Sequence, residues 1–552
     1  MTPRANLDRP IAAPWAAGAN WRRKLTRKMR HSAWSKAVLG AAVFALAGAG
    51  NAMAETELRV AMTAADIPAI DGAPDQGYEG WRFTGYTLYD ALVNWDLSRS
   101  DKAADLTGGL AESWNVDPQD NTRWIFHLRH GVSFHDGCAW NADSAMFNIN
   151  RVLDDTSPQF NQRQAGTARA ISFSNVASVE KVDDYTIAFH TKGPVSIFPY
   201  DMTGFFMVSN CALEAANYDW DVYAQHPQGT GPYKFESIVP RERLTLVRNA
   251  DYWDPNRVPK HDKLTLIPMP EAATRAAALL SGQVDFIEAP SPDTIPRLKS
   301  AGMQIVTAPY PHNWDYQLNH QSGPFSDLRI RQAANYAINR DEMVEFLGGM
   351  ATPAYQRLIP SQAWYGDPVK YTYDPEKARA LLKEAGCMPC KIRVATSTSG
   401  SGQMLPLPMN ELMKEYLDAV GFDTQIEVMD WGAVLSIFFG GAESSDFDAL
   451  NASGAPLEPG QAIIKINTPG KMNDWGDYTN DDVIKMIGEA MSEFDPTKRD
   501  AILTRINEQS VADAAEVYVV HDLNPRALSP KLSGFVQAQS WFQDLTPIVV
   551  NP

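Results

Sequence analysis

The stretch 110–143 constrains the fold of this 552-residue chain more than any other segment. It holds two short runs rich in β-branched and aromatic residues, 114–116 and 122–128, separated by an Asp-Pro-Gln-Asp-Asn turn. This spacing predicts a β-hairpin. Further on, Asn141 begins an Asn-Ala-Asp sequence that supplies capping chemistry for a helix over 144–149. No nucleophile motif or phosphate loop occurs in the stretch, so it predicts structure rather than catalysis.

The first 54 residues differ from the rest of the chain. A basic run over 22–36 precedes the apolar segment 37–47, and Ala52-Met53-Ala54 forms an A-x-A cleavage site. This pattern predicts a signal peptide cleaved after Ala54, and a start at Met29 would give one of ordinary length. The later chain has no apolar run of about 20 residues, the length that a spanning helix needs. We therefore expect an exported protein of the periplasm.

The charge of the chain limits its partners. A formal net charge of −17 becomes −25 without residues 1–54, which carry 9 of the 49 basic and 1 of the 66 acidic residues. A partner with a phosphate backbone requires the opposite sign, so we do not expect nucleic acid binding. The acidity favours solubility, and it also favours positively charged solutes by steering.

Four cysteines, Cys138, Cys211, Cys387 and Cys390, lie in the exported part of the chain, where disulfides are permitted. They allow three connectivities. The Cys387–Cys390 pair follows a helix that ends at Gly386, which favours a local bridge across that turn. A zinc site or a thioredoxin-type redox motif is the alternative for C-x-x-C, but no second pair or nearby histidine accompanies it.

Three further segments have clear local signals. Residues 81–95 show the aromatic and aliphatic spacing of an amphipathic helix that leads into a strand. The sequence Gly-Thr-Gly-Pro-Tyr at 229–233 predicts a tight turn. Within 323–340, Ser326 or Asp327 caps a helix whose apolar residues recur on one face.

Taken together, these motifs resemble the family 5 extracellular solute-binding proteins, the dipeptide, oligopeptide and nickel receptors of ABC importers. The resemblance rests on L-A-E-S-W at 110–114, L-R-x-G-V-x-F-H-D-G at 128–137 and A-D at 142–143, with the turn 229–233 and the helix motif 323–340. We expect the charged residues of the signature, Arg129, His135 and Asp136, to hold a turn rather than to contact ligand.

The resemblance implies an α/β, periplasmic binding protein-like fold with two α/β lobes joined by a hinge and a third, smaller domain. The expected division is a signal peptide over 1–54, a discontinuous lobe I over 55–83, 227–303 and 511–552, domain II over 84–226, and lobe III over 304–510.

In such a fold the solute is enclosed between the lobes by hinge closure. Family likeness and residue type together predict these ligand-binding residues: Trp81, Tyr86, Trp314, Tyr316, Asn319, Ser399, Gly454 and Ala455. Each of these residues could instead have a purely structural role. Aromatic residues at helical spacing often pack in the core, and serine-rich loops are often only exposed to solvent.

One departure from the family pattern bears on the solute. Ala455 falls where dipeptide-type relatives carry an aspartate for the amino group of the ligand. A buried ammonium without a counter-charge is costly, so simple dipeptide recognition is in question. Leu457 replaces the aromatic residue of nickel-type relatives. We therefore rank a short peptide or peptide-like, opine-like solute first and a nickel chelate second.

The expected partners are this solute and an inner-membrane ABC permease, and the protein is expected to be a monomer without a cofactor. No catalytic residue and no resident metal are predicted, although His312, His320 and His521 lie near the expected hinge and could serve a metal. The rival classes are an exported hydrolase, and a chemoreceptor partner or chaperone. The chain contains neither Gly-x-Ser-x-Gly nor His-Glu-x-x-His, which argues against the hydrolase.

Overall fold

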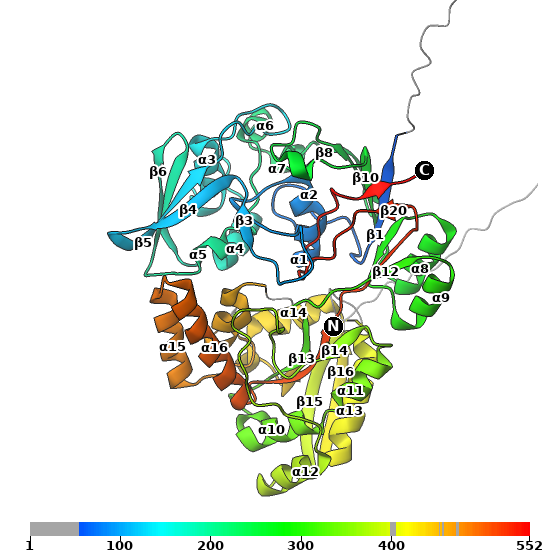
Figure 1. Cartoon of the computed structure of the whole chain (residues 1–552). Coiled ribbons are helices and arrows are strands. Elements are labelled where there is room, and N and C mark those ends of the chain that lie inside the picture. The colour runs from blue at the N-terminus through cyan, green and yellow to red at the C-terminus, as the bar shows by residue number, and fades with distance from the viewer. Residues whose placement is uncertain (1–54, 398–403, 452, 455–456, 471–473) are drawn as a thin grey trace, which may run out of the picture. The chain divides into compact units, whose positions relative to one another are not determined.

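The chain folds into mixed β-sheets covered by helices, which confirms the expected α/β class (Figure 1). The computed structural model describes residues 55–397, 404–451, 453–454, 457–470 and 474–552, and Glu55–Pro552 form one unit. Among these described residues, no helix combines the length and the apolar character needed to cross a bilayer.

The first sheet, called sheet 1, is built from segments far apart in the sequence. Its strand order is β12 (Gln304–Val306), β19 (Arg526–Leu528), β11 (Phe286–Glu288), β1 (Glu57–Met62), β10 (Lys263–Pro268), β9 (Arg243–Arg248) and β8 (Tyr233–Val239). The central strand β1 runs parallel to β10 and β11, while β9 pairs with β10 and β19 pairs with β11 in the antiparallel sense. Helices α8 (Ala272–Ser281) and α9 (Ile295–Ser300) lie in the connections beside it.

Sheet 2 has a parallel half and an antiparallel half. Its strand order is β14 (Ala351–Pro353), β18 (Glu516–Asp522), β13 (Asn313–Leu318), β17 (Ala449–Leu450), β15 (Cys390–Ser397) and β16 (Phe422–Met429). The surrounding helices are α10 (Leu328–Ala337), α11 (Arg340–Phe346), α12 (Pro375–Glu384), α13 (Pro406–Val420), α14 (Trp431–Gly440), α15 (Asp481–Ser492) and α16 (Pro496–Ala512). Strand β13 is buried along its whole length, although the polar residues Asn313, Asp315 and Gln317 alternate with its apolar ones.

Sheet 3 contains the hairpin predicted from the signature. Strands β4 (Ala111–Asp117) and β5 (Asp120–Leu128) pair as expected, and β6 (Val176–Asp183) and β7 (Thr186–Thr191) complete the order β4-β5-β7-β6. The accompanying helices are α3 (Ala142–Leu153), α4 (Gln162–Ile171), α5 (Phe198–Asp201), α6 (Asn210–Ala215) and α7 (Trp220–Tyr223). The predicted cap of α3 is also confirmed, because Asn141 and Ser144 exchange side-chain and backbone hydrogen bonds of 3.1 and 2.9 Å.

The helix predicted within 81–95 is present but not uniform. It runs as α1 (Tyr78–Gly80), a π-helical turn η1 (Trp81–Gly85) and α2 (Tyr86–Leu88), and β2 (Val93–Trp95) follows and pairs with β3 (Leu106–Gly108). A π turn widens the helix and shifts the side chains that follow it, and such turns are frequent at functional sites.

Two segments of the described chain pass between sheet 1 and sheet 2, and they lie side by side. One joins β12 to β13 and the other joins β18 to β19. The amide of Ala308 donates to the carbonyl of Leu523 at 3.1 Å, and the Tyr310 hydroxyl donates to Asp522 at 3.3 Å. Because β18 pairs with β13, the segment 511–552 assigned to lobe I from the sequence contains a strand of sheet 2. The division into lobes stays a prediction.

The signature motif fixes a turn against the Gly-Thr-Gly-Pro-Tyr sequence, as expected of its charged residues. The backbone amide of His135 donates to Gly229 O at 2.8 Å, and its ring Nε2 lies 3.0 Å from Gly231 O. Asp136 accepts a 2.6 Å bond from the Ser209 hydroxyl. Burial lowers the pKa of His135 to about 4, so the ring is neutral at neutral pH and can share the backbone bonds of the turn.

The helix motif over 323–340 likewise serves structure. Asp327 caps α10 by accepting a 2.8 Å bond from the Arg329 amide. Arg331 donates to the carbonyls of Phe325 and Asp513, at 2.8 and 3.1 Å. Asn335 donates to the carbonyl of Glu516 at 2.8 Å, and so ties α10 to β18. The polar residues of the motif thus satisfy backbone groups that packing would otherwise leave unpaired.

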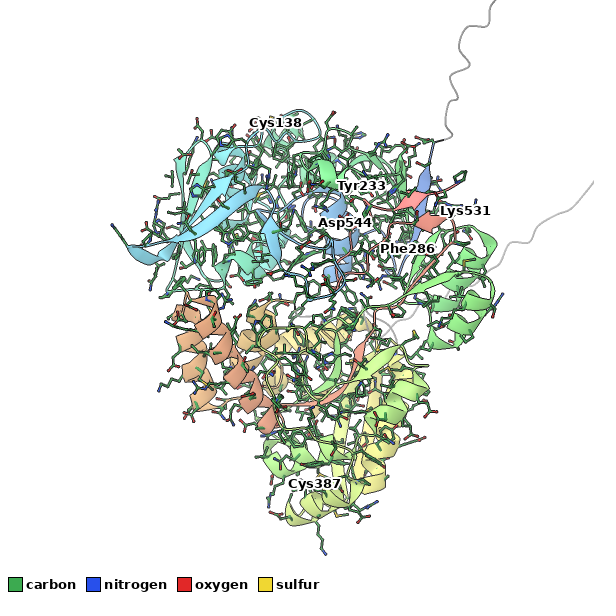
Figure 2. The ribbon with its side chains drawn as sticks, viewed as in Figure 1. Cys138, Tyr233, Phe286, Cys387, Lys531 and Asp544 are labelled. Carbon is green, nitrogen blue, oxygen red and sulfur yellow. A yellow bond between two sulfur atoms is a disulfide. The ribbon has the colours of Figure 1, made fainter. Side chains whose placement is uncertain are left out.

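Both disulfides join cysteines of the described chain, and Figure 2 labels one cysteine of each. The predicted local bridge between Cys387 and Cys390 is confirmed. Cys138 pairs with Cys211 across 73 residues, and so links the end of the signature to α6.

The first prediction concerns Gly231. A Cβ atom there would lie 2.5 Å from the carbonyl carbon of Leu88, the carbonyl oxygen of Thr87 and the amide nitrogen of Tyr89. Backbone cannot rotate away as a side chain can, so we expect Gly231→Ala to lower the free energy of unfolding by about 1–3 kcal/mol. Urea denaturation followed by tryptophan fluorescence measures the change.

Gly166 provides the matched control for that experiment. It lies inside α4, and a Cβ atom there would meet nothing within 4 Å. Gly166→Ala should leave stability unchanged or raise it by up to about 1 kcal/mol, because alanine favours the helix. Equal effects of the two substitutions would contradict the close approach at Gly231.

The second prediction compares the two disulfides. A crosslink restricts the unfolded chain more when it closes a longer loop. Removing the Cys138–Cys211 bridge, which spans 73 residues, should cost roughly 4 kcal/mol, against roughly 2 kcal/mol for Cys387–Cys390, which spans 3. Melting of the two double alanine variants tests the order, and a larger loss from the local bridge would contradict it.

Candidate functional site

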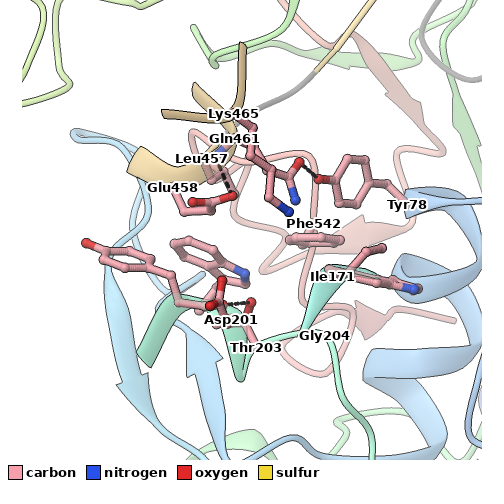
Figure 3. A pocket seen from close by; sticks show the side chains of 13 residues that line it. Tyr78, Ile171, Asp201, Thr203, Gly204, Leu457, Glu458, Gln461, Lys465 and Phe542 are labelled. Carbon is pink, nitrogen blue, oxygen red and sulfur yellow. Dashed lines mark hydrogen bonds between the residues drawn. The ribbon is translucent and has the colours of Figure 1, made fainter. Parts of the chain in front are cut away.

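A small cavity lies where residues associated with all three sheets meet. Its walls come from the helical segment 78–81, from α4 and α5, from the segment 457–465 and from Phe542 (Figure 3). The space left between the side chains is about 30 Å3, enough for about two water molecules.

Five aromatic residues line the cavity. The rings of Tyr78, Trp81 and Phe542 contact one another, with centroid separations of 5.4 Å for Tyr78–Trp81, 5.7 Å for Tyr78–Phe542 and 6.4 Å for Trp81–Phe542. Trp95 and Tyr200 form a second pair at 5.9 Å. Such a wall buries apolar solute surface and leaves orientation to a few polar groups.

The polar groups enter the cavity from opposite sides. Figure 3 shows Glu458, Gln461 and Lys465 on one side and Asp201 on the other. Glu458 Oε1 accepts a 2.8 Å bond from the Gln461 amide, while Oε2 is buried and has no hydrogen-bond partner among the described residues. The Tyr78 hydroxyl donates to the side-chain oxygen of Gln461 and so bridges the two sides.

Burial dominates the electrostatics of the two carboxyls. It raises the pKa of Asp201 to about 8, with a further contribution from the facing Glu458 and a partial offset from Lys465. Burial also raises the pKa of Glu458, and Lys465 again acts in the opposite direction. Two carboxyls and one ammonium therefore share a space that excludes most water.

Irregular helical turns position this site from both sides. Trp81 begins the π turn η1, and Gln461 lies in a second π turn, η6 (Gly460–Ile464), which is followed by η7 (Lys465–Asn467). Gly204 leaves room for the Trp81 ring, since a Cβ atom at Gly204 would lie 2.2 Å from it.

Of the predicted ligand-binding residues, Trp81 lines the cavity. Tyr86 lies directly behind the lining: its hydroxyl donates to the carbonyl of Thr203 at 3.2 Å, and its ring is 4.9 Å from that of Phe542.

Other predicted residues lie within sheet 2. Trp314 and Tyr316 have no exposed surface and pack in the core between sheet 2 and its helices. The Tyr316 hydroxyl donates to Asn410 Oδ1 at 2.6 Å. Asn319 directly follows β13, and its side-chain oxygen accepts hydrogen bonds from the backbone amides of Gln321 and Ser322.

Of the three remaining predicted residues, the structure describes Gly454. Gly454 pairs with Asn313 through two backbone hydrogen bonds of 3.0 and 3.2 Å, so its loop is anchored on β13. Ser399 and Ala455 lie outside the described residues. The structure thus brings Trp81 and Tyr86 together at the cavity, and it brings Trp314, Tyr316 and Gly454 together around β13.

Several cavity residues were not predicted from the sequence: Tyr78, Trp95, Tyr200, Asp201, Glu458, Gln461, Lys465 and Phe542. For one of these residues, Asp201, the sequence does contain a signal. Asp201 is an acid inside a strongly apolar and aromatic run over 197–208, and a carboxyl in a run that must be buried points to a special role.

The three histidines near the expected hinge differ in their contacts. His320 Nε2 lies 2.9 Å from the carbonyl of Ala515. His312 Nδ1, 3.6 Å from Asp522, and His521 Nδ1, in β18, are buried and have no hydrogen-bond partner among the described residues. Across the part of the chain that the structure describes, no group of three or more His, Cys, Asp or Glu residues is placed to hold a metal ion.

Comparison with solved structures shows the same fold in periplasmic binding proteins. The Helicobacter pylori protein DppA, solved in complex with the peptide STSA, has a TM-score of 0.76 at 24% identity and covers 90% of this chain and 99% of its own. A dipeptide-binding protein from Pseudoalteromonas sp. SM9913, solved with Met-Leu, has a TM-score of 0.75 at 21% identity, covering 90% and 100%. These likenesses confirm the expected fold class.

Sequence comparison supports the same relationship. The glutathione-binding protein GsiB of Shigella dysenteriae is 28% identical over 448 residues, which are 79% of this chain and 84% of that protein. The model of the bacterial extracellular solute-binding proteins, family 5 Middle, matches residues 105–462. The resemblance drawn from the motifs is confirmed, and the chain belongs to the family 5 bacterial extracellular solute-binding proteins.

Proposed function

We propose that this protein captures a short peptide or peptide-like solute in the periplasm and delivers it to an inner-membrane ABC permease. The observation that carries the proposal is the cavity itself, which combines an aromatic wall with a few convergent polar groups drawn from distant parts of the chain. Sites of this composition bind small molecules by enclosing them.

The relatives support a peptide solute. GsiB is named for glutathione, a peptide, and the two solved neighbours hold a tetrapeptide and a dipeptide. Opine-like solutes, which share the amino and carboxyl groups of peptides, stay within the same proposal.

Capture by this cavity requires a change of shape. Its free volume of about 30 Å3 is far below that of a dipeptide, so a solute enters only when the two sides separate. The Tyr78–Gln461 hydrogen bond joins the sides in the present conformation. The paired crossings between sheets 1 and 2 are the natural hinge, because they are short and lie side by side.

The proposal extends to export and domain organisation. Residues 1–54 would be removed after Ala54, and the mature protein would act as a monomer without catalysis. The lobes would be 55–83, 227–303 and 511–552 for lobe I, 84–226 for domain II and 304–510 for lobe III. Closure of lobe III on the other two parts would form the surface that the permease recognises.

The third prediction tests the solute class. A ligand that binds only the folded protein raises the melting temperature by mass action. We expect a rise with short peptides or glutathione, measured by a thermal-shift screen that also contains opines, sugars and nickel with histidine. A response to nickel–histidine alone, or to none of the peptide-like compounds, would contradict the proposal.

The fourth prediction separates a cavity residue from a core residue. Trp81→Ala removes a ring from the cavity wall and should weaken peptide binding by more than about 1 kcal/mol. Trp314→Ala removes a fully buried core ring and should instead lower the free energy of unfolding by about 3–5 kcal/mol.

Isothermal titration and urea denaturation of both variants measure the two quantities. A folded Trp81→Ala protein with unchanged affinity would remove the cavity from the binding site. Weakened binding by a fully stable Trp314→Ala protein would return Trp314 to the site.

A further inference from the structure

We propose that the cavity receives a positively charged group of the solute, a protonated amine or a guanidinium, so that the transported peptide is cationic at the end held there. The inference rests on the proposed function and goes beyond it by naming the charge of the solute. It follows from the lining of the cavity, and three observations carry it.

The aromatic wall is the first observation. Trp81 and Phe542 are stacked with an interplanar angle of 15°, while Tyr78 stands edge-on to both at 89° and 76°. Aromatic faces attract cations, and tryptophan does so most strongly. Aromatic side chains are also used by proteins to recognise quaternary ammonium groups.

The second observation is the excess of carboxyls. Asp201 and Glu458 face the same small space from opposite sides, and Lys465 is the single cation among the lining residues that the structure describes. Asp201 Oδ2 accepts one long bond of 3.4 Å from Asn175. Glu458 Oε2 is buried without a hydrogen-bond partner among the described residues. The pKa of about 8 keeps Asp201 protonated at pH 7 in the empty cavity, and a bound cation would allow both carboxyls to ionise beside the one resident ammonium.

The third observation is energetic. Burial disfavours the ionised carboxyls and raises the pKa of both, because the resident ammonium offsets only part of the cost. A second cation would complete the balance. The formal charge of −25 on the chain after residue 54 would also attract such a solute over longer distances.

This arrangement explains how the protein can do without the aspartate that dipeptide-type relatives carry at position 455. Glu458 follows Ala455 by three residues in the same loop, and Asp201 supplies a second carboxyl from the opposite wall. The counter-charge for an ammonium is thereby relocated rather than lost.

Matched peptides test the proposal by isothermal titration. Ala-Arg-Ala and Ala-citrulline-Ala differ in the charge of one side chain, and free and acetylated Ala-Ala-Ala differ in the charge of the N-terminus. We expect one of the two charged members to bind at least about tenfold more tightly than its neutral partner. The pair that shows the difference identifies the source of the charge.

Carboxamide variants show where the preference arises. Asp201→Asn and Glu458→Gln should each reduce the preference for the charged peptide at least about fivefold and leave the neutral peptide less affected. Asp251→Asn and Glu214→Gln replace exposed carboxyls of the same types and should retain the full preference. If Asp201→Asn does not fold, Glu458→Gln carries the test.

Proton release gives an independent readout. The titratable groups that face Asp201 and Glu458 are each other, Lys465, Tyr78 and Tyr200. An incoming cation lowers the pKa of the carboxyls, so binding at pH 7 should release up to about one proton. The heat of binding should then vary with the ionisation enthalpy of the buffer, and Asp201→Asn should reduce this variation.

The outcomes separate the two proposals. Equal affinity for charged and neutral peptides, or a preference that survives both carboxamide substitutions, overturns the cationic solute and leaves peptide capture intact. Failure of every peptide to bind overturns both.

Discussion

The buried carboxyl of Asp90 is the interaction on which the placement of the site depends. It accepts hydrogen bonds from the Tyr252 hydroxyl at 2.8 Å, the Trp253 indole at 2.9 Å and the Thr230 hydroxyl at 3.0 Å. A buried carboxyl without such partners would be strongly destabilising, and burial still raises its pKa despite these donors. By joining the end of the helical segment 78–88 to the Gly-Thr-Gly-Pro-Tyr turn, it holds the π turn that carries Trp81. The Gly-Thr-Gly-Pro-Tyr turn therefore does not line the cavity itself, but it fixes the backbone position of the helical segment that carries Trp81.

Local structure was predicted correctly from the sequence where a single residue determines it, as at the start of a helix. Asn141 and Asp327 cap the helices that they were expected to cap, because capping depends on residues within one turn. The bridge between Cys387 and Cys390 was predicted for the same reason, while the partner of Cys138 lies 73 residues away and leaves no local trace. The π turn at Trp81 was not predicted, because the spacing of apolar residues over 81–95 is the same as that of an ordinary amphipathic helix. The cavity was missed almost entirely: Tyr78 and Phe542 meet there across most of the chain, and no spacing rule connects them.

The site contrasts with the core that surrounds it. Trp314 and Tyr316 were attractive ligand candidates because aromatic residues are frequent in binding sites, yet they fill the interior of sheet 2. The cavity uses the same residue type but adds two carboxyls and one ammonium within a small space. A cluster of charged groups among aromatic rings distinguishes this site from the core around Trp314 and Tyr316. The tight packing of the cavity also explains why Gly204 is needed opposite Trp81.

The positions of β18 and β19 have a consequence for how the protein is made. Strand β18 lies between β14 and β13, and β19 lies between β12 and β11, so the last part of the chain occupies interior places in both sheets. A nascent chain that ends before residue 516 has neither sheet complete, however much of it has emerged. The long-range pairing that closes the fold must therefore wait for the end of synthesis. The C-terminal strands therefore decide when both sheets can be completed.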